Sequence, residues 1–147
     1  MEEQIKMARL NLELKRKTNE IKQRKQELEA VKHEMLVENE KKYHVNKHTL
    51  LAAIASIREK KAGLAYDDVT RLTLTDEIHN IEDQLNIIRD ERDMEARRIV
   101  ADIFAQRNEV EAEEREVMEW YEAEKLAIME AQYEARKEAA MQEGGVQ

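Results

Sequence analysis

Apolar residues recur every seven positions along the first part of the chain. One series runs through Met7, Leu14, Ile21, Leu28 and Met35, and it continues one residue later through Leu36, Tyr43, Leu50, Ile57 and Leu64. A shift of one residue adjusts a coiled coil locally without ending the helix. A second series with coiled-coil spacing runs through Ile78, Ile81, Leu85, Ile88, Ile99, Ile103, Val110, Val117, Trp120 and Ile128. The pattern predicts two long amphipathic helices.

The few helix-breaking residues divide the chain at one place. Proline is absent, and the three glycines are Gly63, Gly144 and Gly145. Gly63 follows two lysines and suits the left-handed conformation that often ends a helix, whereas Thr73 or Thr75 suits the N-cap of a second one. We therefore expect one elongated domain with a helix over 1–62, a loop over 63–74, a second helix over 75–142 and a flexible tail over 143–147.

Charge is distributed unevenly between the two predicted helices. Residues 1–61 contain 15 Lys and Arg against 10 Asp and Glu, whereas the rest of the chain contains 10 against 23. If the chain folds back near Asp68, residue i faces about residue 137 − i, and opposite charges meet as in an antiparallel coiled coil. This register pairs Arg24 with Glu113, Ile21 with Val117, and Leu50 with Ile88.

The register predicts an all-α protein whose two long helices form an antiparallel coiled-coil hairpin. The alternative is an extended rod that pairs with other coiled-coil chains. An antiparallel dimer of such rods would make the same contacts between two chains.

Chemistry-bearing motifs are scarce. Glu40, His44 and His48 follow one another at intervals of four residues and form a weak candidate for a metal site. Two paired helices offer no cleft that would shift the pKa of a catalytic group. We expect no catalytic residues, no cofactor and no enzymatic activity.

Two groups of apolar residues are candidate contacts with a partner. One lies at the predicted loop and comprises Leu64, Tyr66, Val69, Leu72 and Leu74. The other lies near the far end of the second helix and includes Trp120, Tyr121 and Tyr133. Few residues can bury the loop group, and the distal group carries more apolar surface than one facing helix can cover. We therefore expect other proteins as partners, helical ones above all, and self-association as an alternative.

These features favour a non-enzymatic structural coiled-coil protein, which acts as a scaffold, spacer or adaptor within a filament, axoneme, virion or similar assembly. An alternative is a stalk or chaperone-like adaptor that binds a partner through its tip. In architecture and size the predicted hairpin resembles the stalk proteins of flagellar and type III export machines. The absence of a long apolar run argues against membrane insertion. We expect an intracellular location, either cytoplasmic or within a particle assembled in the cytoplasm.

A third alternative concerns the basic block between Lys15 and Lys25, which could bind the phosphates of a nucleic acid. The net charge of −8 and the acidic block that faces these residues in the predicted register argue against this function.

Overall fold

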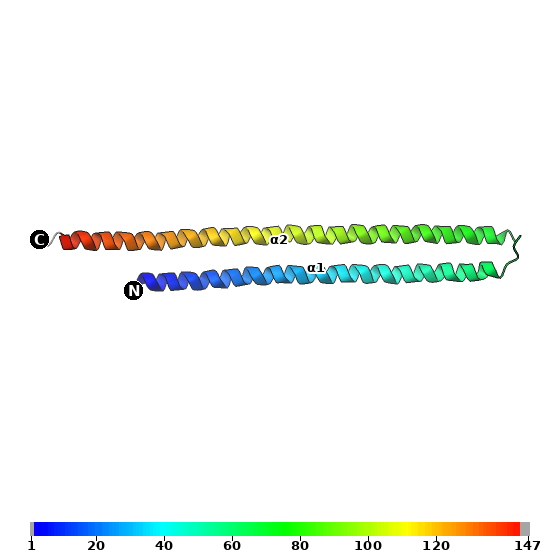
Figure 1. Ribbon diagram of the computed structural model, residues 1–147, viewed down its shortest axis with the longest axis horizontal. Helices are drawn as coiled ribbons and strands as arrows, with labels where there is room; N and C mark the ends of the chain where they lie inside the picture. The colour runs from blue at the N-terminus through cyan, green and yellow to red at the C-terminus, as the bar shows by residue number, and fades with distance from the viewer. Residues whose placement is uncertain (1, 145–147) are drawn as a thin grey trace. The chain divides into compact units, whose positions relative to one another are not determined.

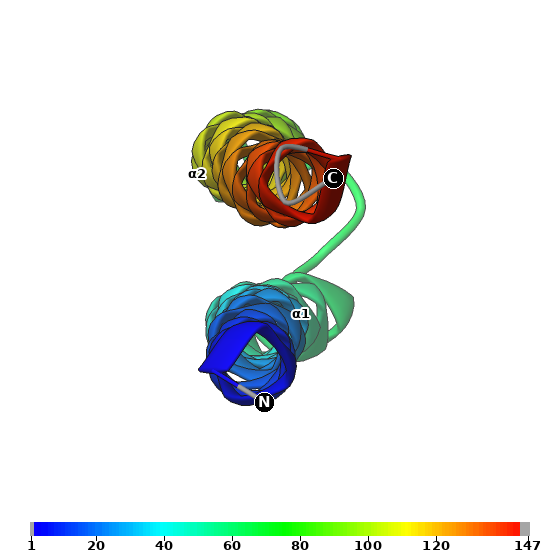
Figure 2. The same cartoon turned by 90° about the vertical axis from the view of Figure 1, so that its left-hand side faces the viewer.

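The structure, a computed structural model, describes residues 2–144. They form two helices, α1 (Glu2–Ala62) and α2 (Thr70–Gly144), joined by residues 63–69 (Figure 1). The helices pack against each other in opposite directions, and the view along them shows α1 and α2 side by side (Figure 2). The predicted all-α helical hairpin is therefore confirmed.

Contacts divide the hairpin into two units. The terminal unit pairs the start of α1, up to Leu28, with the part of α2 that begins at Ala105. The turn unit comprises Glu29–Phe104 and contains the connection between the helices. Each unit is thus a pair of antiparallel helical segments.

A narrow apolar seam holds each unit together. The side chains of Ile54, Ile78, Ile99 and Ile103 are buried in the turn unit. Those of Leu10, Ile21 and Val110 are buried in the terminal unit. Burial of one such side chain stabilises the folded state by about 1.5–3 kcal/mol, so these few residues provide most of the driving force for pairing.

The residues of α1 that face α2 explain why the seven-residue apolar series shifts by one position between Met35 and Leu36. From Ile21 they recur every eleven residues at Lys32, Tyr43 and Ile54, all of which are buried or half-buried. Eleven residues make three turns of about 3.67 residues each, so these side chains stay on one face of the helix.

The start of α2 differs from the predicted boundary. The helix begins at Thr70, so residues 70–74 of the predicted loop are helical. Asp68 caps it, because its Oδ1 accepts a hydrogen bond from the Thr70 amide at 2.9 Å. Thr75 is instead inside the helix, where its hydroxyl donates to the Arg71 carbonyl at 2.8 Å.

The predictions for the C-terminal ends of the two helices also require correction. Gly63 does not have a positive φ, and its amide donates to the Lys60 carbonyl at 3.2 Å in a tight final turn. Glu143 and Gly144, which we assigned to the flexible tail, belong to α2, whereas 145–147 lie outside the described residues. Across the described chain, neither helix contains an apolar stretch long enough to cross a membrane.

Candidate interaction surfaces

The connection between the helices is held by Asp68 and Arg71. The hydrogen bond from the Thr70 amide lowers the pKa of the Asp68 carboxyl. Arg71 Nη1 donates to the carbonyl of Lys61, in the last turn of α1, at 2.9 Å and to that of Leu64, in the connection, at 3.1 Å. The Arg71 guanidinium therefore ties the start of α2 to the end of α1.

This turn exposes apolar side chains instead of burying them. Tyr66 is 95% exposed, Val69 is 74% exposed and Leu72 is 68% exposed. Leu64 and Leu74, the other two loop residues predicted to contact a partner, are half-buried. The exposed three residues form an apolar patch at the turn, which we call the tip patch.

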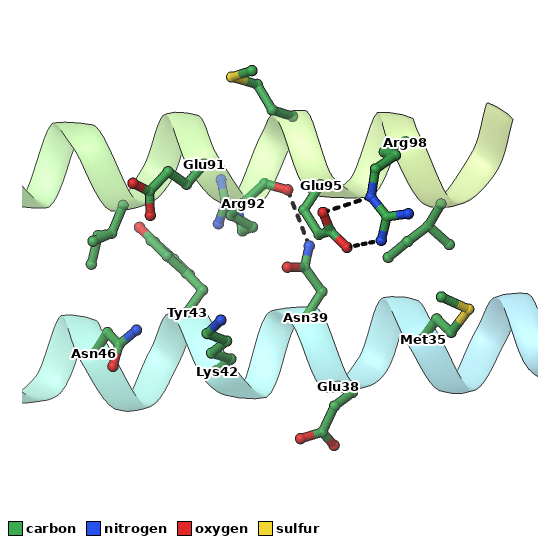
Figure 3. A pocket seen from close by; sticks show the side chains of 13 residues that line it. Met35, Glu38, Asn39, Lys42, Tyr43, Asn46, Glu91, Arg92, Glu95 and Arg98 are labelled. Atoms are coloured by element: carbon green, nitrogen blue, oxygen red, sulfur yellow. Dashed lines mark hydrogen bonds and ion pairs between the residues drawn. The ribbon is translucent and has the colours of Figure 1, made fainter. Parts of the chain in front are cut away.

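A groove between the helices lies within the turn unit (Figure 3). Asn39 and Tyr43 point from α1 toward α2, and Asn39 Nδ2 donates to the Arg92 carbonyl at 3.0 Å. The Arg92 guanidinium lies 4.2 Å from the centre of the Tyr43 ring, within the range of a cation–π contact. The seam is therefore polar here, and a polar side chain in a coiled-coil seam fixes the alignment of the helices.

The charged residues beside the groove pair mainly within α2. Arg98 Nε donates to Glu95 at 2.9 Å, and Arg98 Nη1 donates to Asp102 at 2.9 Å. The hydrogen bond from Arg98 lowers the pKa of the Glu95 carboxyl. Glu38, which the relation between residue i and residue 137 − i places about level with Arg98, points away from α2 (Figure 3). Beside the groove, ion pairs within α2 therefore replace part of the cross-helix pairing that we expected, and Arg92 Nε lies 3.7 Å from Glu40 Oε1 across the two helices.

Of the weak candidate metal ligands Glu40, His44 and His48, the first two lie close to each other. His44 Nε2 lies 3.5 Å from Glu40 Oε2, and both side chains are mostly exposed. No group of three His, Cys, Asp or Glu side chains in residues 2–144 is arranged to hold a metal ion. The structure therefore does not assemble Glu40, His44 and His48 into a metal site.

In the terminal unit, charged residues pair across the two helices. Arg24 forms a bidentate ion pair with Glu113, in which Nη2 lies 3.2 Å from Oε1, as the register predicted. This hydrogen-bonded contact raises the pKa of Arg24 and lowers that of Glu113. The residues that directly follow these two also pair, with Lys25 Nζ 2.8 Å from Glu114 Oε2.

The apolar pairs predicted by the register lie along the seam. Ile21 is buried and Val117 is half-buried in the terminal unit. Leu50 and Ile88 are half-buried in the turn unit. All four residues therefore occupy the inward side of their helices.

The aromatic residues predicted as distal partner contacts have different environments. The Lys17 ammonium lies 3.8 Å from the centre of the Trp120 ring, and Tyr121 donates its hydroxyl to Asn11 Oδ1 at 2.9 Å. Trp120 and Tyr121 thus take part in pairing α1 with α2. Tyr133 is 66% exposed and remains available for an external contact.

The fold and these surfaces define an antiparallel two-helix coiled coil with a narrow core and exposed apolar patches. No protein-family model matches the chain, and comparisons with curated proteins and with solved structures find no match.

Proposed function

We propose that this chain is a non-enzymatic structural protein that acts as a coiled-coil scaffold, spacer or adaptor within a larger protein assembly inside the cell. The observation that carries the proposal is the tip patch, where Tyr66, Val69 and Leu72 are each at least two-thirds exposed. Exposed apolar side chains that gather in one place are typical of protein contact sites. Asp68 and Arg71 fix the backbone of the turn, so a partner would bind a preformed surface.

The same patch supports a second function, in which the hairpin is a stalk or chaperone-like adaptor of an export machine and binds its partner through the tip. The two functions differ in where the partner lies. A stalk needs only the tip, whereas a structural component of a filament or particle also needs contacts along the helices.

Site-specific photo-crosslinking in the native cell tests the proposal. A photoreactive residue at position 66 is expected to form a protein adduct of discrete mass, whereas the same residue at the exposed Asn80 of α2 provides the matched control. If the proposal is correct, the adduct forms at position 66 and disappears when Val69 and Leu72 are replaced by serine. No adduct at position 66, or an adduct that persists in the serine variant, would contradict it.

The partner identified from the adduct at position 66 then separates the two functions, by its co-purification, without crosslinking, with the serine variant. Loss of the partner, with helicity unchanged by circular dichroism, supports binding through the tip alone. Retention of the partner supports contacts along the helices.

A further inference from the structure

The outward side of α1 in the terminal unit carries a basic surface around an exposed leucine. Leu12 is 69% exposed although Leu10, two residues earlier, is buried against α2. Two residues correspond to about 200° around a helix, so Leu12 faces away from α2. Around it lies a shallow depression lined by Arg9, Leu12, Glu13, Lys15, Arg16 and Asn19. We define the basic face as Ile5, Arg9, Leu12, Lys15, Arg16 and Lys22.

The outward side of α2 in the same unit has the opposite charge. Leu126 is 56% exposed although Ile128, two residues later, is half-buried on the inward side. Met129 and Tyr133 extend the apolar stripe and are 53% and 66% exposed. Glutamates flank the stripe, and we define the acidic face as Glu119, Glu122, Leu126, Met129, Glu130 and Tyr133.

Most charges on these faces have no partner in the same chain. Among the described residues, Arg9, Lys15 and Lys22 form no ion pair, and neither do the glutamates of the acidic face. The two faces point outward from different helices of one unit, so a single chain cannot bring them together. Pairing them requires a second molecule.

Within the terminal unit, the pairing of α1 with α2 places residues of the basic face and residues of the acidic face at the same height along the helix axis. Because Arg24 meets Glu113, Lys15 lies level with Glu122 on α2. By the same alignment, Leu12 lies within about one residue of the level of Leu126, a distance of ~1.5 Å along the axis. If a second copy lies beside the first, with no shift along the helix axis, Leu12 of one copy therefore meets Leu126 of the other. In the same arrangement Lys15 meets Glu122.

The ends of the two faces also match in this arrangement. Ile5 would lie between the levels of Met129 and Tyr133, and Arg9 would lie within one turn of Glu130. Apolar contacts in the centre with charges at the edges are the arrangement that coiled coils use to select partner and register.

We propose that copies of this chain pack side by side through the terminal unit, with the basic face of one copy against the acidic face of the next. This inference rests on the proposed function and specifies how such a scaffold would extend. Because the two contacting faces are different, the contact is heterologous and each added copy leaves one face of each kind open. The assembly therefore grows beyond a dimer.

Sedimentation velocity of the full chain over a range of concentrations tests the proposal. At low salt we expect a series of species that increases in size with concentration and does not stop at the dimer. At about 1 M salt, where the Debye length is ~3 Å, the same protein should return to a monomer. A chain that remains monomeric at all concentrations would overturn the proposal, as would a single closed dimer.

Charge reversal identifies the surfaces involved. A basic-face variant replaces Arg9, Lys15 and Lys22 with glutamate, and an acidic-face variant replaces Glu119, Glu122 and Glu130 with lysine. Each variant alone should lose self-association, whereas an equimolar mixture of the two should regain it because each contributes one complementary face. Circular dichroism checks that both variants remain helical.

A matched control reverses three exposed basic residues of the turn unit, Lys41, Lys60 and Arg97. This variant has the same net charge as the basic-face variant, and we expect it to associate as the unmodified chain does. Failure of the mixture to associate, or equal loss in the control, would contradict the proposed surfaces.

A polyanion is the competing occupant of the basic face. Binding of a single-stranded oligonucleotide that requires Arg9, Lys15 and Lys22, by a chain that stays monomeric, would overturn the proposal in favour of a phosphate-binding surface. These outcomes leave the tip patch untouched, so the crosslinking experiment at Tyr66 judges the proposed function separately.

Discussion

The turn unit and the terminal unit both bury an apolar seam, but they differ in the ion pairs that join their helices. The turn unit buries four isoleucines, and its cross-helix ion pairs are long, at 4.0 Å for Arg58–Glu82 and 3.7 Å for Arg92–Glu40. The terminal unit buries three apolar side chains and has a shorter cross-helix ion pair, Lys25–Glu114, at 2.8 Å. The buried seam therefore stabilises both units, and closer charge pairing in addition aligns the helices of the terminal unit.

Truncation of the turn-unit seam should have the largest effect on stability. Ile99 is 2% exposed, so Ile99→Ala should destabilise the hairpin by about 2–5 kcal/mol, measured by urea unfolding followed by circular dichroism. Ile87→Ala is the matched control, because Ile87 lies on the same helix and is 55% exposed. Its effect should stay within about 0.5 kcal/mol, and equal losses at the two sites would refute the assignment of the seam.

Reversal of the charge of Arg24 in the terminal unit should lower stability by a smaller amount, and reversal of the charge of Glu113 as well should restore it. Arg24→Glu places two carboxylates together and should lower the melting temperature, whereas Arg24→Glu combined with Glu113→Arg should restore most of the loss. The loss should shrink as salt is raised, because both side chains are partly exposed. No recovery in the double variant would show that the pair does not set the alignment.

The same ion pair predicts a dependence on pH. The hydrogen bond from Arg24 lowers the pKa of Glu113 below its ordinary value of 4.5, so the pair stabilises the fold above that pH. This contribution is lost as the pH falls through the lowered pKa of the folded state. The difference in melting temperature between the unmodified chain and Glu113→Gln should therefore be largest near neutral pH and shrink below 4.5. A difference that stays constant with pH would contradict the assignment, and Glu116→Gln serves as a control because Glu116 makes no ion pair among residues 2–144.

The smallest expected effect is a gain in stability at the turn. Gly63 lacks a positive φ, and a methyl group there would lie 3.6 Å from the Lys60 carbonyl oxygen, an ordinary contact. Gly63→Ala should therefore stabilise the hairpin by about 0.4–1 kcal/mol, because alanine restricts the unfolded chain more than glycine does. Destabilisation measured by urea unfolding would instead support the left-handed conformation expected from the sequence.

The seam and the alignment could be predicted because they depend on regular spacing. Apolar residues at coiled-coil intervals gave the two helices, and opposite charges about Asp68 gave the pairing of Arg24 with Glu113. The same register also relates Lys17 to Trp120, so their contact could have been found from sequence, although we assigned Trp120 to a partner surface instead.

The turn could not be predicted to the same degree because it depends on individual hydrogen bonds. Thr75 and Asp68 are both acceptable N-caps by residue type, and only the path of the chain selects Asp68. Arg71 could be recognised as a basic residue but not as a donor to the carbonyls of Lys61 and Leu64. The local pairing of Arg98 within α2 likewise competes with the cross-helix pairing that the register suggested.

The hairpin is tested most directly by whether Arg24 and Glu113 of one chain meet each other. The protein contains no cysteine, so Arg24→Cys with Glu113→Cys introduces a single pair of thiols that a short bis-maleimide can join. At high salt and low protein concentration, the hairpin predicts a crosslinked monomer with altered mobility in denaturing electrophoresis. A covalent dimer as the main product would show that the helices pair between chains and would contradict the hairpin.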